Sequence, residues 1–215
     1  MEIMKRFKDR SHAGKELAER LSKYKDREDI LVLGLPRGGI PVAYEIAKKL
    51  DAPLDVLVVR KLGLPYNEEV AFGAIASGGI KVLNEEIVNR ARLSKKAMES
   101  VVEKEKKELK RRQDQYGSSL GKRDFRGKTI ILVDDGIATG ATMQAAINGL
   151  KQTAAAKVVM AIPTAPQDSL SEIRPMVDDA ICIMTPSPFY GVGNWYNRFS
   201  QTTDDEVKNL LEKSK

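Results

Sequence analysis

Apolar runs of four or five residues alternate with amphipathic segments along most of the chain. Continuous apolar runs at 30–33, 130–133 and 158–162 are typical of strands that are buried on both faces of a parallel sheet. An amphipathic helix is predicted from Ser11 to about Tyr24, and a late strand is predicted over 180–184. This alternation of strands and helices predicts an α/β fold with a mostly parallel sheet.

The composition fits an ordinary globular enzyme. With 215 residues, of which 42% are hydrophobic and 31% are charged, the chain can bury one sizeable core, so a single domain over 1–215 is expected. No apolar signal segment stands at the N-terminus and no run is long enough to span a bilayer. We therefore expect a cytoplasmic protein with no membrane partner.

One cysteine, Cys182, and one histidine, His12, limit the available chemistry. A single cysteine cannot form an internal disulfide, and we expect a buried structural thiol. A Cys/His metal cluster cannot be assembled from one residue of each type, and a histidine-based triad is disfavoured. A metal would have to arrive with phosphate, which indicates Mg²⁺ held through ligand oxygens and carboxylates.

The segment 129–143, T-I-I-L-V-D-D-G-I-A-T-G-A-T-M, carries the strongest candidate site. Its apolar strand meets two adjacent carboxylates, Asp134 and Asp135, and then a short loop opens into a helix. Gly136 and Gly140 allow tight turns, and the unpaired N–H groups at a helix N-terminus can hold a phosphate without any lysine. The residues expected to hold a 5-phosphate are Gly136, Ile137, Ala138, Thr139, Gly140, Ala141 and Thr142.

Carboxylates beside a phosphate would repel it unless they accept hydrogen bonds from hydroxyls or share a cation with the ligand. A ribose 5-phosphate supplies the hydroxyls, and its phosphate can share a cation with the carboxylates. An apolar strand ending in Asp-Asp is also found in nucleoside triphosphatases, but the G-x-x-x-x-G-K-[ST] loop that they need does not occur in this chain. The structural alternative is that the acids cap a turn and the glycines close an ordinary connection.

A second strand-to-helix junction lies near the N-terminus. The apolar strand that begins at Ile30 leads through Arg37, Gly38 and Gly39 into a helix with Pro41 in its first turn. Both junctions should emerge at the carboxyl ends of parallel strands, where ligands of α/β proteins bind. If the strands are neighbours or next neighbours, the loops should lie roughly 5 to 10 Å apart. A molecule with phosphate at both ends could then bridge them.

The segment 129–143 resembles the phosphoribosyl-pyrophosphate signature of type I phosphoribosyltransferases: a hydrophobic strand, two acidic residues, a small loop and T-G-x-T. The resemblance spans roughly 30–185. The whole chain, with its P-F-Y-G-V-G-N-W-Y tail, is similar to an uncharacterised phosphoribosyltransferase-like family. This resemblance implies three layers, a core at about 30–185 and a small C-terminal hood at about 186–215. A basic helical insertion is expected at about 84–125; it takes the place of the family's flexible element between the second and third core strands, but departs from it in length and helical pattern.

In the resembled family the first loop holds pyrophosphate, so Arg37, Gly38 and Gly39 are expected to bind it. Arg60 and Lys61 follow a strand predicted over 54–59 and resemble the basic pair that helps to neutralise pyrophosphate. A solvated strand edge is the alternative for this pair. By the same resemblance, the catalytic residues are expected to be Asp134, Asp135 and Lys61.

The formal charge of +6 is concentrated in 95–128, which holds twelve Lys and Arg against six Asp and Glu. Ser94 can cap a helix there, followed by K110-R-R and a G117-S-S-L-G121 linker. The first interpretation is a solvated helix with intermixed charges, the second is a lid that brings cations over pyrophosphate, and the third is a nucleic-acid contact. No aromatic residues separate the basic ones, which disfavours nucleic acid as a partner.

Five aromatic residues fall within 189–199, although the chain has one Trp, six Tyr and five Phe in all. In phosphoribosyltransferases a hood beside the sheet holds the nucleophile, frequently a base stacked on an aromatic ring. The candidates for that surface are Phe189, Tyr190, Trp195 and Tyr196. Packing of the tail, or a contact in a homodimer, is the alternative.

The resemblance implies a Mg²⁺-dependent transferase of nucleotide metabolism. It would move phosphoribosyl from phosphoribosyl pyrophosphate to a nitrogen nucleophile, for example a nucleobase, and release pyrophosphate. Asp134 and Asp135 are the candidate metal ligands. The main alternative is a phosphoribosyl-pyrophosphate sensor or RNA-binding regulator that kept the loops without the reaction. A partner module for a separate hydrolase is a third hypothesis.

Overall fold

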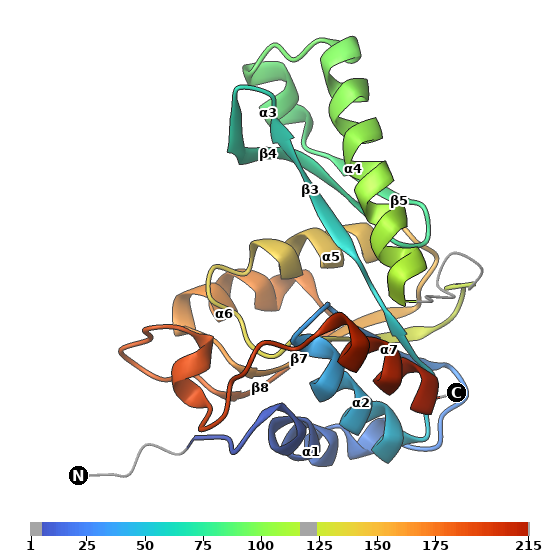
Figure 1. The fold of residues 1–215 in the computed structure, drawn as a ribbon, viewed down its shortest axis with the longest axis vertical. Coiled ribbons are helices and arrows are strands. Elements are labelled where there is room, and N and C mark those ends of the chain that lie inside the picture. The colour runs from blue at the N-terminus through green and yellow to red at the C-terminus, as the bar shows by residue number, and fades with distance from the viewer. Residues whose placement is uncertain (1–5, 117–123, 215) are drawn as a thin grey trace.

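The computed structural model describes residues 6–116 and 124–214, which form a compact body and a protruding arm (Figure 1). A parallel five-stranded sheet with the order β2-β1-β6-β7-β8 forms the centre of the body. Its strands are β1 (Ile30–Gly34), β2 (Leu54–Val56), β6 (Thr129–Val133), β7 (Lys157–Thr164) and β8 (Asp179–Met184). The predicted α/β class with a mostly parallel sheet is confirmed.

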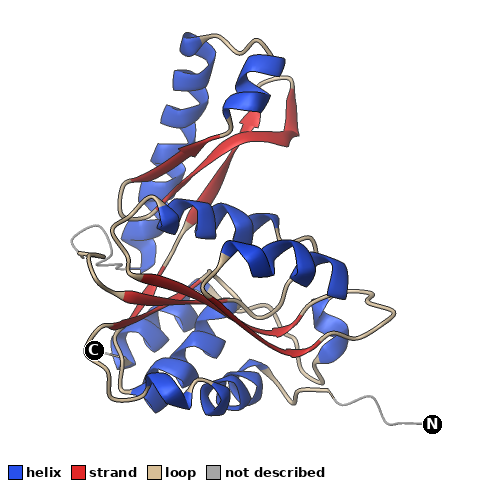
Figure 2. Cartoon of the chain, turned by 180° about the vertical axis from the view of Figure 1, so that it is seen from behind, coloured by secondary structure: helices blue, strands red, loops and turns tan. Residues whose placement is uncertain are grey.

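Helices cover both faces of this sheet, as the predicted three layers require (Figures 1 and 2). One face carries α1 (Arg10–Arg20), α2 (Gly39–Leu50) and α7 (Asp204–Lys213), and the other carries α5 (Ala141–Lys151) and α6 (Gln167–Ile173). Short 3₁₀ turns lie at η1 (Ser22–Tyr24), η3 (Arg174–Met176) and η4 (Val192–Trp195). β1 and β6 are buried along their whole length because helices pack on both sides of them.

The arm is an antiparallel three-stranded sheet with two helices, and it stands on the α5 side of the body (Figures 1 and 2). It consists of β3 (Val59–Leu64), β4 (Asn67–Ala76), β5 (Ile80–Leu83), α3 (Glu85–Arg90) and α4 (Lys95–Tyr116). β4 and β5 form a hairpin around 77–79, with Gly78 and Gly79 at φ of 83° and 79°. Ser94 caps α4 as expected, accepting from the Ala97 N–H at 3.2 Å.

The strand predicted over 54–59 is wrong in its extent. Its last hydrogen bond to β1 is from the Leu57 N–H to the Gly34 carbonyl at 3.0 Å. Val58 is instead held by Ser77 of the arm: the Ser77 N–H donates to the Val58 carbonyl at 2.9 Å, and the Ser77 hydroxyl accepts from the Val58 N–H at 3.0 Å. The arm therefore begins well before 84, where the helical insertion was expected to start.

Other sequence features can also be placed. Cys182 lies partly buried on β8, and burial raises the pKa of its thiol to about 11, so the thiol stays protonated at neutral pH. The G117-S-S-L-G121 linker lies outside the described residues. Over 6–116 and 124–214, every helix is too short or too polar to cross a bilayer.

Candidate functional site

The two strand-to-helix loops emerge at the same edge of the sheet. β1 and β6 are direct neighbours in parallel register, and Gly34 lies opposite Val133. The pairing continues one residue further, because the Leu35 N–H donates to the Val133 carbonyl at 2.9 Å. β1 and β6 thus meet the condition under which the two loops were expected to lie close together.

The loops lie in contact, and two glycines make this close approach possible. A Cβ on Gly39 would lie 2.7 Å from the Val133 carbonyl oxygen and 2.9 Å from the Asp134 Cα. A Cβ on Gly38 would overlap the carboxylate of Asp135. A side chain at either position would therefore push the first loop away from the acidic pair.

The first loop offers fewer backbone donors than the sequence predicted. The Gly39 N–H donates to the Leu35 carbonyl at 3.0 Å, so it is not free for a ligand. Within the described residues, the amides of Arg37 and Gly38 have no backbone partner, and they lie just before α2 begins. Gly39 thus serves the close approach to β6, while the two preceding amides remain available to an anion.

The second loop ends at a helix terminus without a side-chain cap. Gly140 is the N-cap of α5 with φ of 78°, a left-handed conformation that favours glycine. The Ile137 N–H donates to the Thr164 carbonyl at 2.9 Å, which anchors the base of the loop. Ala138, Thr139, Ala141 and Thr142 are exposed. The start of α5 therefore combines exposed residues with the lack of a side-chain cap, as an anion site would require.

Asp134 and Asp135 stand between the two loops. Burial and the neighbouring Asp135 carboxylate raise the pKa of Asp134 well above its ordinary value. The Asp135 N–H donates to Asp134 Oδ1 at 2.8 Å, which fixes the first carboxylate against the backbone. Two adjacent carboxylates in this position can accept hydrogen bonds from sugar hydroxyls.

Arg10 of α1 is a site residue that the sequence did not reveal. Its Nε donates to Asp135 Oδ2 at 2.8 Å, with only 12% and 15% of the two side chains exposed. The guanidinium also lies over the Phe199 ring at 3.9 Å and donates through Nη1 to the Ser200 carbonyl at 2.7 Å. Arg10 therefore compensates one charge of the acidic pair and ties it to the C-terminal segment.

The C-terminal segment packs directly against the site. The Tyr196 hydroxyl donates to the Asp135 carbonyl at 2.6 Å, and a Cβ on Gly136 would lie 2.6 Å from Cγ1 of Val192. Among the aromatic residues proposed for the acceptor surface, Trp195 is only 3% exposed, whereas Tyr190 is 78% exposed. Trp195 is thus an interior residue, and it stacks with Phe189 at a centroid distance of 6.3 Å.

The predicted basic pair lies in the arm. Arg60 and Lys61 are inside β3, beyond the point where the chain leaves the central sheet. The Arg60 guanidinium donates to Glu105 of α4 at 2.7 Å, and Lys61 is exposed. The structure therefore separates this pair from the carboxyl edge of β2, where the sequence had placed it.

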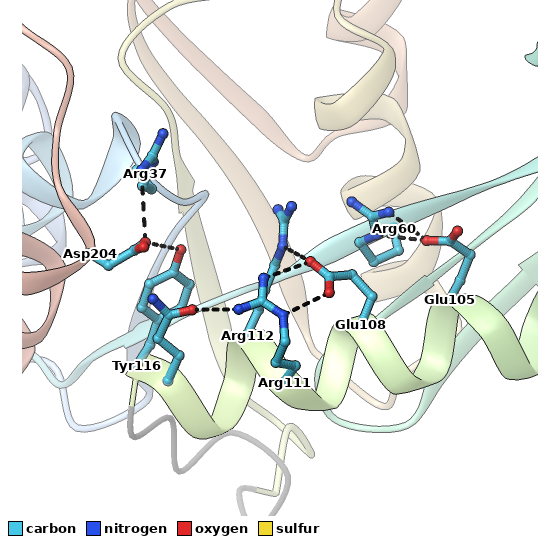
Figure 3. Close-up of polar contacts among 9 residues, drawn as sticks. Arg37, Arg60, Glu105, Glu108, Arg111, Arg112, Tyr116 and Asp204 are labelled. Atoms are coloured by element: carbon cyan, nitrogen blue, oxygen red, sulfur yellow. Dashed lines mark hydrogen bonds and ion pairs between the residues drawn. The ribbon is translucent and has the colours of Figure 1, made fainter.

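Arg37 of the first loop faces the carboxyl end of α4 (Figure 3). Its Nη1 is 4.0 Å from Asp204 Oδ1, and the same oxygen accepts from the Tyr116 hydroxyl at 2.9 Å. Burial, assisted by Asp204, raises the pKa of Tyr116 to about 12, so Tyr116 remains a donor at neutral pH. The end of the basic helix is thereby fixed beside the first loop.

The donor set for a metal is small. Among the described residues, no three His, Cys, Asp or Glu side chains are close enough together to hold an ion. The protein offers the carboxylates of Asp134 and Asp135, and a hard cation there would need further oxygens from a ligand and from water. This set fits Mg²⁺ that arrives with a phosphate ligand.

Comparison with known proteins gives a consistent result. The phosphoribosyl transferase domain family matches residues 4–187. A Mycobacterium tuberculosis protein that is provisionally named a phosphoribosyl transferase, found in strains CDC 1551 and H37Rv, is 46% identical over 211 residues. That alignment covers 98% of this chain and 47% of the relative, so the chain spans about half the length of the curated relatives it matches.

A solved structure agrees over nearly the whole chain. The protein TT1426 from Thermus thermophilus is 37% identical, with a TM-score of 0.85 over 97% of this chain and 98% of its own. This likeness includes the arm and the C-terminal segment, since both fall within the matched length. Taken together with the paired loops and the acidic pair, these matches show that the chain belongs to the phosphoribosyl transferase domain family.

Proposed function

We propose that this protein transfers phosphoribosyl from phosphoribosyl pyrophosphate to a nitrogen nucleophile and releases pyrophosphate. The observation that carries the proposal is the contact between the two strand-to-helix loops, with two carboxylates between them. The loop 136–142 would hold the 5-phosphate, and the amides of Arg37 and Gly38 would hold the pyrophosphate. Asp134 and Asp135 would accept hydrogen bonds from the ribose hydroxyls.

The reaction is a substitution at the anomeric carbon. The nitrogen lone pair forms the new C–N bond, the C–O bond to pyrophosphate breaks, and the oxygen leaves with the electron pair. Positive charge grows on the ribose ring near Asp134 and Asp135, and negative charge grows on pyrophosphate near Arg37. Each group placed where charge develops can lower the barrier by about 2.7 to 4 kcal/mol.

We propose Mg²⁺ as the cofactor, with Asp134 and Asp135 as its protein ligands. Bound there, Mg²⁺ would neutralise part of the charge on the substrate and stabilise the leaving pyrophosphate. Arg10 would keep Asp135 ordered and reduce the repulsion between this carboxylate and the substrate phosphates. The acceptor would approach from the C-terminal segment, where Tyr190 is exposed.

Isotope exchange tests the proposal. The protein is incubated with phosphoribosyl pyrophosphate, Mg²⁺ and labelled pyrophosphate, together with single members of a panel of nucleobases and other amines. We expect label to enter phosphoribosyl pyrophosphate with at least one acceptor, because transfer is reversible. Binding of phosphoribosyl pyrophosphate should also raise the Tm. At a ligand concentration a hundred times the Kd, the free energy of unfolding should increase by about 2.7 kcal/mol. Absence of isotope exchange with every acceptor would contradict the proposal.

A phosphoribosyl-pyrophosphate sensor is the second candidate, and one observation favours it. Arg10 already pairs with Asp135, which reduces the negative charge that this carboxylate offers to the positive charge developing on the ribose ring, so binding could persist without turnover. A sensor would show the rise in Tm with phosphoribosyl pyrophosphate but no isotope exchange with any acceptor. The same two measurements therefore distinguish the two functions.

A further inference from the structure

A small pocket lies between the first loop and the end of the basic helix α4. Its volume is about 260 Å³, and its polar lining consists of Arg37, Arg111, Arg112, Gln115, Tyr116 and Asp204. The lining comes from three parts of the chain that are far apart in sequence: the loop after β1, the end of α4 and the first residue of α7 (Figure 3). Three guanidinium groups thus converge on one space.

Neighbouring carboxylates compensate only part of this charge. Glu108 accepts from Arg111 at 2.8 and 2.9 Å and from the Nε of Arg112 at 2.8 Å. These bonds hold both arginines in fixed orientations. Glu108 bonds to Arg112 only through Nε, and among the described residues no acceptor is bonded to the two terminal nitrogens of Arg112 (Figure 3).

Asp204 is the one carboxylate among the lining residues, and it is 4.0 Å from Arg37 Nη1, beyond hydrogen-bond distance. It also accepts from Tyr116. Arg111 is already engaged, because its Nη1 also donates to Gln115 Oε1 at 3.2 Å. Among the described residues, the guanidinium donors left for a ligand belong to Arg37 and to the terminal nitrogens of Arg112. Two N–H groups of one planar guanidinium can donate to two oxygens of one phosphate, so a phosphate group is the ligand that fits these donors.

The size of the pocket narrows the ligand class. Pockets for drug-sized ligands have volumes of about 300 to 1,000 Å³ and mostly apolar linings. This pocket is smaller and polar, so it suits a small anion better than an apolar, drug-sized ligand. We infer that the pocket formed by Arg37, Arg111 and Arg112 is a phosphate-binding site that the arm contributes to the first loop.

The phosphate group could come from two sources. It could be the outer phosphate of phosphoribosyl pyrophosphate, in which case the inference rests on the proposed function and makes α4 part of the pyrophosphate site. It could instead be free inorganic phosphate. Inorganic pyrophosphate and inorganic phosphate are therefore both used as probes, because their binding requires no acceptor and no turnover.

The test is calorimetric binding of each probe to the wild type and to the variant Arg111→Gln, Arg112→Gln. We expect the variant to bind at least one probe about tenfold to a hundredfold more weakly. The matched control is Lys95→Gln, Lys96→Gln, which removes the same charge from exposed positions about 24 Å away along α4. This control should bind both probes as the wild type does.

A second variant, which should raise the affinity for the probe, distinguishes a loss of binding from a loss of folding. Glu108→Gln removes the carboxylate that competes for both arginines, so it should bind the probe more tightly, which an unfolded protein could not do. Competition between the probe and phosphoribosyl pyrophosphate would assign the pocket to the substrate, and simultaneous binding would assign it to free phosphate. Equal affinities in the wild type and in the Arg111→Gln, Arg112→Gln variant, or an equal loss in the lysine control, would overturn the inference. Failure of isotope exchange alone would contradict the proposed function but not the inference about the pocket.

Discussion

Replacing Asp134 and Asp135 together with asparagine is expected to reduce transfer by about a thousandfold or more while the protein remains folded. Asparagine can still accept hydrogen bonds from ribose hydroxyls, but it carries no charge to stabilise the positive charge that develops on the ring. The bond from the Asp135 N–H to Asp134 Oδ1 can be kept by an amide oxygen, so the loop should retain its shape. Steady-state kinetics and circular dichroism measure the two outcomes. Unchanged turnover in the double variant would rule out the proposed mechanism.

The single variant Asp134→Asn should also be more stable than the wild type at neutral pH when a chelator removes metal ions. The folded protein raises the pKa of Asp134 above 3.8, so the folded state binds the proton more tightly than the unfolded state does. The free energy of unfolding of the wild type therefore falls as pH rises from about 3.8 through the folded pKa. The uncharged asparagine side chain of the variant does not titrate, so the free energy of unfolding of the variant does not fall for this reason. The difference in Tm should vanish below pH 3.8, where the side chain is uncharged in both states.

The variant Gly38→Ala is expected to lower kcat/KM by about a hundredfold, because a displacement of about 1 Å in an active site can cost that much. The backbone at Gly38 has φ of −63°, which alanine adopts without strain, so the effect should come from the added methyl group alone. That methyl group would overlap the carboxylate of Asp135 and would lie 3.2 Å from Arg10 Nε. The Arg10–Asp135 ion pair would have to shift.

Gly127→Ala is the matched control for this substitution. Gly127 has φ of 69°, and among the described residues a Cβ there would meet no atom within 4 Å. The strain of a left-handed alanine should cost about 1 kcal/mol of stability, with no effect on substrate binding. Gly38→Ala should thus lose activity with little change in Tm. Gly127→Ala should lower the Tm with little change in activity. The same pattern of loss in both variants would contradict the contact described between the first loop and Asp135.

The parts of the site that the sequence revealed are local ones. The acidic pair and the glycines of 134–140 follow one another in the chain, and their order reflects one strand, one turn and one helix start. Apolar runs likewise predicted β1 and β6, because burial on both faces leaves no room for polar residues. Short-range physical constraints of this kind are visible in a single sequence.

The remaining parts depend on contacts between distant segments. Arg10 and Asp135 are 125 positions apart, and nothing around Arg10 distinguishes it from a surface arginine at the start of a helix. The start of the arm was missed for a similar reason: Val58 bonds to Ser77, nineteen residues later, instead of continuing along β1. Trp195 was proposed as a ligand surface because aromatic clustering does not distinguish a buried ring from an exposed one.

The central claim is that two loops on β1 and β6 hold opposite ends of one activated sugar. Amide chemical shifts of the ¹⁵N-labelled protein test it most directly. Of the two loops, ribose 5-phosphate should shift only the amides of 138–142, and pyrophosphate should shift only those of Arg37 and Gly38. Phosphoribosyl pyrophosphate should shift both sets at one shared affinity. If phosphoribosyl pyrophosphate perturbs only one loop, or the two loops saturate at different concentrations, the claim is contradicted.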